Sequence, residues 1–206
     1  MEHVTVKDLV LGSGGVLVSG SEEAPVSHVR LDSRQVEPGV LFVPLLGERV
    51  DSHRFLPQVM DQGAAAVLTS QELTLPEGGA GCAVIRVEDT KKALQKIGSY
   101  LRDRLTLPLV GVTGSVGKTT TREMIAAALS ARFRVYKTPG NSNSQVGVPV
   151  TLSEITENDQ VGVIELGMSE PGEMTVIANI ARVDMAVITN IGITHIGQLG
   201  SQEKGS

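Results

Sequence analysis

The sequence predicts an α/β fold in two parts. A small mixed α/β N-terminal domain is expected over residues 1–106, and a P-loop domain with a doubly wound, mainly parallel sheet over residues 107–206. Short apolar runs alternate with amphipathic helical segments along the chain, which is typical of βαβ units. Residues 114–120 lie between such a run and a helical segment, as a phosphate-binding loop does.

The first part consists of short elements. A glycine-rich cluster at residues 11–15 is expected to be a turn. The strand-like run that follows it, at 16–18, argues against a dinucleotide-binding loop, which a helix would follow. Asp89 is a good N-cap for the helix that closes this part. Apolar runs and helical spacing predict strands at 29–31, 41–43, 64–68 and 83–87, and helices at 54–62 and 91–105.

The second part begins after Pro108 and has longer apolar runs. Continuous apolar segments of this kind are typical of parallel strands that are covered on both faces. The predicted strands are 109–112, 161–166 and 185–188, and the predicted helices are 121–131 and 173–180. Because βαβ units are right-handed, we expect a doubly wound sheet that binds its ligand at the carboxyl ends of its strands.

Residues 114–120 read GSVGKTT, between a strand and a helix. The general pattern G-x-x-x-x-G-K-[ST] would require glycine at position 112, where this chain has Val112, so the spacing of the glycines departs from it. A chance surface turn is the alternative, and the strand–loop–helix context argues against it. Small residues let backbone N–H groups approach phosphate oxygens, so the sequence predicts a nucleoside triphosphate site.

Side chains of this loop suggest the chemistry. Lys118 would reach the β- and γ-phosphates as a point charge, and the Thr119 hydroxyl would bind Mg²⁺. Thr120 and Thr121 are weaker candidates, because hydroxyl groups at the start of a helix often only cap it.

Polar residues follow other strands of the second part. Glu165 ends an apolar run, and a carboxylate beside a phosphate loop is a natural Mg²⁺ ligand; helix capping is the alternative. His195 follows the run at 185–188, and its spacing alone leaves a structural role open. A polar loop between Gly140 and Gly147 contains Asn141, Ser142 and Asn143, and its amides could bind a phosphate or a carboxylate.

Composition limits the class of protein. The formal net charge is −5 without a basic block, and aromatic residues make up 2%, which argues against nucleic acid or an anionic membrane as the main partner. The single cysteine, Cys82, excludes an intrachain disulfide and a cysteine-based zinc site. We find neither a signal peptide nor a membrane span, and expect a cytoplasmic protein.

Residues 113–121 resemble the ATP loop of the Mur ligases, which add amino acids to the peptidoglycan precursor. Residues 32–45 and 47–55 resemble the uridine-binding domain of the same family. Other segments are most similar to members that add D-alanyl-D-alanine, with members that add diaminopimelate or lysine as the alternative. These segments are residues 140–149, 165–168, 190–195 and 199–201.

The resemblance implies a role for individual residues. It places ATP at Gly114, Ser115, Val116, Gly117, Lys118, Thr119, Thr120 and Asn141. It places Mg²⁺ at Thr119, Glu165 and His195, and makes Lys118, Glu165 and His195 the catalytic residues. Ser33, Arg34 and Asp51 would bind the uridine-linked substrate.

The reaction that the resemblance implies begins with ATP phosphorylating the terminal carboxylate of UDP-N-acetylmuramoyl-tripeptide. The amine of D-alanyl-D-alanine would then attack the acyl phosphate. One alternative is a non-catalytic module that binds the precursor and ATP. A folylpolyglutamate-type ligase is a further alternative, although such relatives lack the region over residues 32–55.

The family resemblance also bears on the extent of the chain. Mur ligases look like three-domain proteins, and this sequence ends at Ser206, shortly after His195. We therefore expect a fragment that has a partial central domain, lacks the C-terminal ligase domain and does not catalyse ligation alone. A complete protein is expected to be a monomer.

Overall fold

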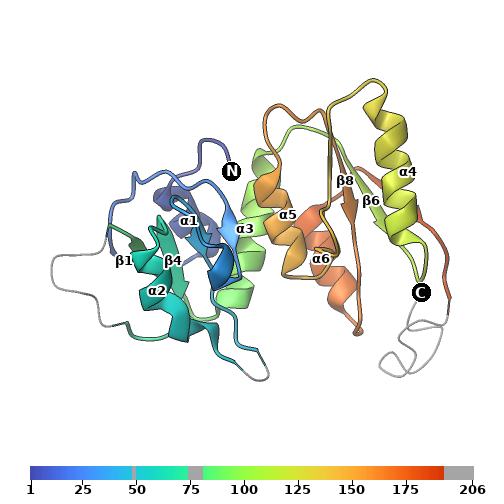
Figure 1. The fold of residues 1–206 in the computed structure, drawn as a ribbon. Coiled ribbons are helices and arrows are strands. Elements are labelled where there is room, and N and C mark those ends of the chain that lie inside the picture. Colours follow the sequence, from blue (N-terminus) through green and yellow to red (C-terminus); the bar gives the residue numbers. More distant parts are fainter. Residues whose placement is uncertain (48–49, 74–80, 193–206) are drawn as a thin grey trace. The chain divides into compact units, whose positions relative to one another are not determined.

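The computed structural model describes residues 1–47, 50–73 and 81–192. The chain forms two compact units that are divided between Tyr100 and Leu101, inside helix α3 (Thr90–Arg104; Figure 1). Each unit has its own sheet with helices packed against it. The predicted α/β class is therefore confirmed.

The first unit is built on a five-stranded sheet with the order β1-β5-β4-β3-β2. Its strands are β1 (Val16–Ser19), β2 (Val29–Arg30), β3 (Leu41–Phe42), β4 (Ala66–Thr69) and β5 (Ala83–Arg86). β1 is antiparallel to β5, and the other neighbouring strands are parallel. The sheet is therefore mixed, with one antiparallel pair at its β1 edge.

Helices cover both faces of this sheet. Helix α2 (Leu56–Asp61) follows a 3₁₀ helix, Ser52–Phe55, and these two elements replace the single helix predicted at 54–62. Leu56 and Val59 of α2 pack with Phe42 and Val67. Alternate strand residues point to the opposite face, so the other buried side chains belong to a second layer. They are Leu41, Leu68 and Ile85 from the strands, Leu9 from α1 (Val6–Ser13), and Leu94 and Ile97 from α3.

Residues 11–13, where the sequence predicts the start of a turn at 11–15, belong to helix α1. The helix starts with a capping box, in which the Thr5 N–H donates to Asp8 Oδ2 at 2.8 Å. It continues through Ser13 and ends at Gly14, whose φ of 70° is left-handed. The prediction was wrong for residues 11–13 because the glycine that stops the helix is Gly14, and Gly12 stays helical.

The second unit has an entirely parallel sheet with the order β7-β8-β6-β9. Its strands are β6 (Leu109–Thr113), β7 (Val135–Lys137), β8 (Val161–Glu165) and β9 (Met185–Ile188). β6 lies between β8 and β9. Because the three strands are parallel, their carboxyl ends lie at the same edge of the sheet. That edge is where the sequence predicts the ligand.

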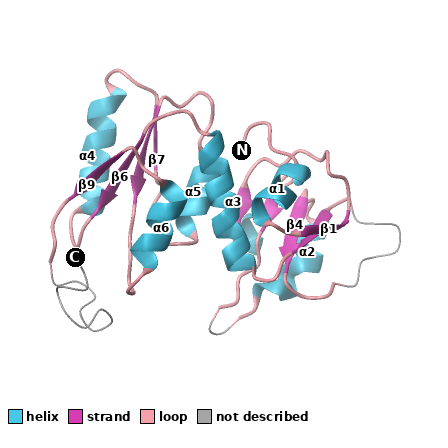
Figure 2. Ribbon diagram, turned by 180° about the vertical axis from the view of Figure 1, so that it is seen from behind, coloured by secondary structure: helices cyan, strands magenta, loops and turns pink. Residues whose placement is uncertain are grey.

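Helices lie on both faces of this second sheet (Figure 2). On one face, α4 (Lys118–Ser130) packs Ala126 against Val112 and Val163. On the other, α5 (Gly147–Glu154) and α6 (Glu173–Ala181) share a core with Leu109 and Ile164. The sheet is thus doubly wound, as predicted.

Strand β7 and helix α5 are not among the predicted elements. β7 is three residues long, which is too short to show a pattern. α5 begins at Gly147 and has Pro149 in its first turn, and both residue types indicate a loop when they are read locally. Within the described residues, no helix is long and apolar enough to cross a membrane.

Candidate functional site

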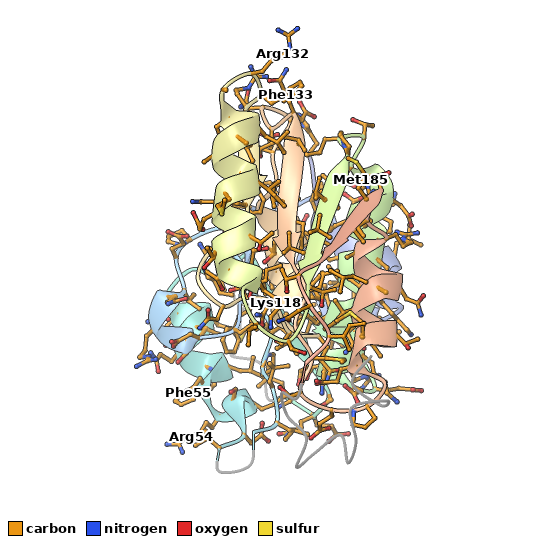
Figure 3. The ribbon with its side chains drawn as sticks, turned by 90° about the vertical axis from the view of Figure 1, so that its right-hand side faces the viewer. Arg54, Phe55, Lys118, Arg132, Phe133 and Met185 are labelled. Atoms are coloured by element: carbon orange, nitrogen blue, oxygen red, sulfur yellow. The ribbon has the colours of Figure 1, made fainter. Side chains whose placement is uncertain are left out.

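The predicted phosphate loop connects the end of β6 to the start of α4. Figure 3 shows Lys118 at this end of α4, with Arg132 and Phe133 beyond the other end. Gly114 has a φ of 133° and Gly117 a φ of 82°, values that residues with a Cβ atom rarely adopt. The glycines thus let the chain turn sharply from strand to helix.

Lys118 folds back over this loop. Its Nζ donates to the carbonyl oxygen of Gly114 at 2.8 Å, so the ammonium group lies at the mouth of the turn. Thr120 is exposed in the first turn of α4. The positive end of the helix and the ammonium group together favour a negatively charged ligand here.

The residues after β9 hold the loop in shape. The N–H groups of Ser115 and Val116 donate to the backbone oxygen and to Oδ1 of Asn190, at 3.1 and 3.0 Å. The Thr189 hydroxyl donates to the carbonyl oxygen of Val116 at 2.6 Å, and the N–H of Gly192 donates to Ser115 Oγ at 2.8 Å. His195 lies outside the described residues, three positions after Gly192.

Glu165 ends β8 and is 2% exposed. Its Oε2 accepts from the Thr119 hydroxyl at 3.0 Å and from Arg122 Nη1 at 3.1 Å, and its Oε1 accepts from Asn143 Nδ2 at 2.8 Å. Its own backbone N–H donates to Thr138 Oγ1. The carboxylate is therefore fixed beside the phosphate loop by groups from α4 and from the loop after β7.

Thr119 and Glu165 suit Mg²⁺. Mg²⁺ prefers hard oxygen ligands and is usually held by one or two carboxylates together with substrate phosphates. Here a hydroxyl oxygen and a carboxylate oxygen lie 3.0 Å apart at the start of a phosphate-loop helix. The described residues contain no cluster of three or more histidine, cysteine, aspartate or glutamate side chains that could hold a metal. One hydroxyl and one carboxylate would leave the other positions of a Mg²⁺ ion to phosphate oxygens and water.

Asn143, rather than Asn141, is the residue of the predicted polar loop that contacts Glu165. Asn141 is exposed, and its carbonyl oxygen accepts from the N–H of Asn143. It is Asn143 that contacts Glu165, and the Asn143 carbonyl oxygen also accepts from the N–H of Gly167 at 2.8 Å. Arg122, which was not among the predicted site residues, lies one helical turn after Thr119 and is 4% exposed. The i, i+3 spacing was the available signal.

The predicted substrate residues of the first unit lie after parallel strands. Ser33 begins the 3₁₀ helix that follows β2 and is buried, whereas the side chain of Arg34 is 86% exposed. Arg34 forms a two-pronged ion pair with Asp32, with Nη2 and Oδ2 2.6 Å apart. Arg34 thus presents a guanidinium group at the carboxyl edge of the sheet.

This ion pair predicts an unusual titration. The side-chain hydrogen bond from Arg34 lowers the pKa of Asp32 to about 2. A lowered folded-state pKa means that the pair stabilises the fold above about pH 4, and that this stabilisation is lost as the pH falls through 2. We expect carboxyl NMR shifts to show Asp32 titrating near pH 2, and Arg34→Met to return it toward its ordinary value. An unchanged titration in the variant would contradict the pairing.

Asp51 belongs to a chain of hydrogen bonds. Its Oδ1 lies 2.6 Å from Nδ1 of the buried His53, and its Oδ2 accepts from Gln71 Nε2. His53 Nε2 accepts from the N–H of Ser70 at 3.2 Å and lies 3.1 Å from Ser70 Oγ. Because Nε2 accepts, the Nδ1 atom of a neutral imidazole carries the hydrogen and donates a hydrogen bond to Asp51 Oδ1. The backbone N–H of His53 is the main cause that lowers the pKa of Asp51.

We expect His53→Ala to destabilise the first unit by about 1–3 kcal/mol, because it removes the buried partner of Ser70 and Asp51. Urea unfolding would measure the change. The neighbouring Arg54→Ala is the control: Arg54 is exposed and lies 5.2 Å from the centroid of the Phe55 ring (Figure 3). Its loss should cost less than about 1 kcal/mol. Equal losses in the two variants would contradict the role of His53.

Two family models together match most of the chain. The model described as "Mur ligase family, catalytic domain" matches residues 25–101, and the "Mur ligase middle domain" model matches residues 112–204. The two matches fall in the order in which the chain forms its two units.

Two similar proteins share one name. UDP-N-acetylmuramoyl-tripeptide--D-alanyl-D-alanine ligase of Bacillus subtilis is 43% identical over 200 residues, which are 97% of this chain and 43% of that protein. The protein of the same name from Escherichia coli is 37% identical over 84% of this chain and 37% of its own length. The chain thus spans less than half of the length of these relatives.

Solved structures agree with the sequence matches. MurF of Acinetobacter baumannii has a TM-score of 0.88 at 33% identity, over 97% of this chain and 44% of that one. MurF ligase of Thermotoga maritima, in complex with ADP, has a TM-score of 0.77 at 30% identity, over 87% of this chain and 41% of that one. The fold, the family models and the relatives all lead to one assignment: this chain belongs to the Mur ligase family.

Proposed function

We propose that the protein carrying this chain is an ATP-dependent ligase of peptidoglycan precursor synthesis. It adds D-alanyl-D-alanine to UDP-N-acetylmuramoyl-tripeptide, the reaction named for its relatives. The observation that supports this most is the phosphate loop at residues 114–120, with Thr119 3.0 Å from the buried carboxylate of Glu165. An ADP complex of a relative with the same fold supports nucleotide binding.

We assign the two ligands to different parts of the chain. Residues 1–106 would bind the uridine-linked precursor, and residues 107–206 would bind ATP. Ser33, Arg34 and Asp51 follow parallel strands of the first unit or lie in its loops. The Nε and Nη2 atoms of the exposed Arg34 donate to Asp32, and its Nη1 would be the nitrogen that contacts a diphosphate. Asp51 would act indirectly, because its carboxylate is already bonded to His53 and Gln71.

The second unit would supply charge for phosphoryl transfer. Lys118 would move from the Gly114 carbonyl to the β- and γ-phosphates. Backbone N–H groups of the loop other than those of Ser115 and Val116, which donate to Asn190, would hold the other phosphate oxygens, with Asn141 at the rim. Thr119, Glu165 and His195 would hold Mg²⁺, which neutralises charge on the transferred phosphoryl group. Lys118, Glu165 and His195 are therefore the proposed catalytic residues.

Phosphorylation makes the precursor carboxylate a better electrophile. The oxygen of that carboxylate attacks the γ-phosphate, ADP leaves, and the amine of D-alanyl-D-alanine then displaces phosphate to form the amide. The chain's part in this is to orient the phosphates and balance their charge, which is the main source of rate in phosphoryl transfer.

The alternatives differ in substrate or in activity. A ligase that adds diaminopimelate is less well supported, because the structure of such an enzyme is 21% identical and shares only the fold. A non-catalytic module would not need Lys118 and Thr119, and both are present.

We further propose that the protein is a cytoplasmic monomer without a nucleic-acid partner. ATP is available in the cytoplasm, and the chain has no basic block.

Calorimetric titration with Mg²⁺–ADP tests the nucleotide site. We expect the chain to bind one ADP, and Lys118→Met to weaken binding by roughly 10- to 100-fold, the value of a charge-assisted hydrogen bond. Lys91→Met removes an exposed lysine from the first unit and should leave ADP binding unchanged. Absence of binding, or equal binding by the Lys118 variant, would refute the proposed site.

A further inference from the structure

Arg122 is a buried cation in the second unit for which the proposed reaction gives no role. It lies on α4, one turn after Thr119, and is 4% exposed. Its Nη1 donates both to Glu165 Oε2 at 3.1 Å and to the carbonyl oxygen of Gly140 at 2.9 Å. One guanidinium nitrogen thus joins the end of β8 to the loop after β7.

The other side of the guanidinium group is held as well. Nε and Nη2 of Arg122 donate to Glu123 Oε1 at 3.2 and 2.7 Å, and the second oxygen of Glu123 pairs with Lys137 of β7. The planar fork of an arginine therefore has a fixed orientation, and its Nη1 edge faces Glu165. A lysine could not make these contacts together, because its ammonium group is a single point.

Glu165 has little freedom as a result. Asn143 holds Oε1, and Arg122 and Thr119 both hold Oε2. A buried carboxylate needs a charged partner or several donors to offset its desolvation, and Arg122 is the only cation paired with it among the described residues. The oxygen that Arg122 contacts is also the one that accepts from Thr119, another of the proposed metal ligands.

We propose that Arg122 is a positioning residue for the metal: it fixes Glu165 Oε2 next to Thr119, in place to receive Mg²⁺ with a bound nucleotide. The proposal rests on the nucleotide site proposed above. Groups that hydrogen-bond to metal ligands set their orientation, and their loss typically lowers metal affinity by roughly 10- to 100-fold. A residue that only fixes α4 to the sheet would instead weaken nucleotide binding to the same extent with and without metal.

The test separates these roles by measuring ADP affinity calorimetrically, first in EDTA and then over a Mg²⁺ series. For Arg122→Met we expect unchanged affinity in EDTA, and a Mg²⁺ midpoint raised by roughly 10- to 100-fold. Mn²⁺ titration followed by electron paramagnetic resonance should show the same loss on the ADP complex. Arg132→Met removes an exposed arginine just beyond α4 and should match the unchanged chain (Figure 3).

Arg122→Lys keeps the charge and covers the case in which the methionine variant does not fold. The Mg²⁺ midpoint of Arg122→Lys should be higher than that of the unchanged chain. Where both variants fold, it should be lower than that of Arg122→Met. The proposal is overturned if a folded Arg122→Met has the same Mg²⁺ midpoint as the unchanged chain. If only Arg122→Lys folds, the same result in that variant overturns it. Equal losses of ADP affinity with and without Mg²⁺ would also overturn it. Failure of the unchanged chain to bind ADP would instead refute the nucleotide site itself.

Discussion

Gly114→Ala is expected to abolish measurable nucleotide binding. Gly114 has a φ of 133°, and a Cβ atom there would lie 2.1 Å from Thr189 Oγ1 and 3.0 Å from backbone atoms of Asn190. The backbone strain alone costs on the order of 1–3 kcal/mol. To relieve the overlap, the residues after β9 must move, and their bonds to Ser115 and Val116 shape the loop. Calorimetry with Mg²⁺–ADP and thermal unfolding would measure both effects.

Gly172→Ala is the matched control for this variant. Gly172 also has a positive φ, of 86°, but no atom lies within 4 Å of the position that a Cβ would take, and the residue caps α6. The control should therefore lose some stability from strain and keep its nucleotide affinity. If Gly114→Ala bound ADP as well as the control does, the structure of the loop would be wrong.

Among these variants, Glu165→Ala should cause the largest loss of stability, about 3–5 kcal/mol, because it removes the one buried carboxylate paired with Arg122 and leaves that guanidinium only the more exposed Glu123. The change also removes acceptors from Thr119 and Asn143. The free energy of unfolding in urea is the measurement. Glu170→Ala, at an exposed position in the following loop, should change it by less than about 0.5 kcal/mol.

A double variant tests the cause of that loss. Replacing a buried ion pair by apolar groups is often neutral, whereas removal of one partner is costly. We therefore expect Glu165→Leu with Arg122→Met to be more stable than Glu165→Ala, although it should lose the Mg²⁺ dependence of ADP binding. If the stability lost by the double variant equals the sum of the losses in Glu165→Leu and in Arg122→Met, the two side chains do not interact in the folded protein.

Strong patterns in the sequence predicted most of the elements. The runs that became β6, β8 and β9 are continuous and apolar, and the spacing of Ala93, Leu94, Ile97 and Leu101 predicts α3. Elements with weak or mixed signals were missed or misread. β7 has three residues, α5 contains Pro149, and the glycine-rich end of α1 was taken for a turn.

The candidate site shows the same division. Position after a strand was enough to connect Glu165 with the phosphate loop, and the structure places Thr119 3.0 Å from it. Arg122 was missed, and Asn143 was predicted only as one of the amides of its loop, because their contacts with Glu165 depend on which elements meet in space. Asn141 and Asn143 are two positions apart in one loop, and only the folded backbone shows which of them faces the carboxylate.

The most direct test of the central claim is a calorimetric titration of the chain with UDP-N-acetylmuramoyl-tripeptide, without nucleotide. We predict one binding site that Lys118→Met leaves unchanged and that Arg34→Met weakens, because the guanidinium of Arg34 is exposed at the carboxyl edge of the first sheet. A folded chain that does not bind this precursor, or that binds it equally well after Arg34→Met, would contradict the account.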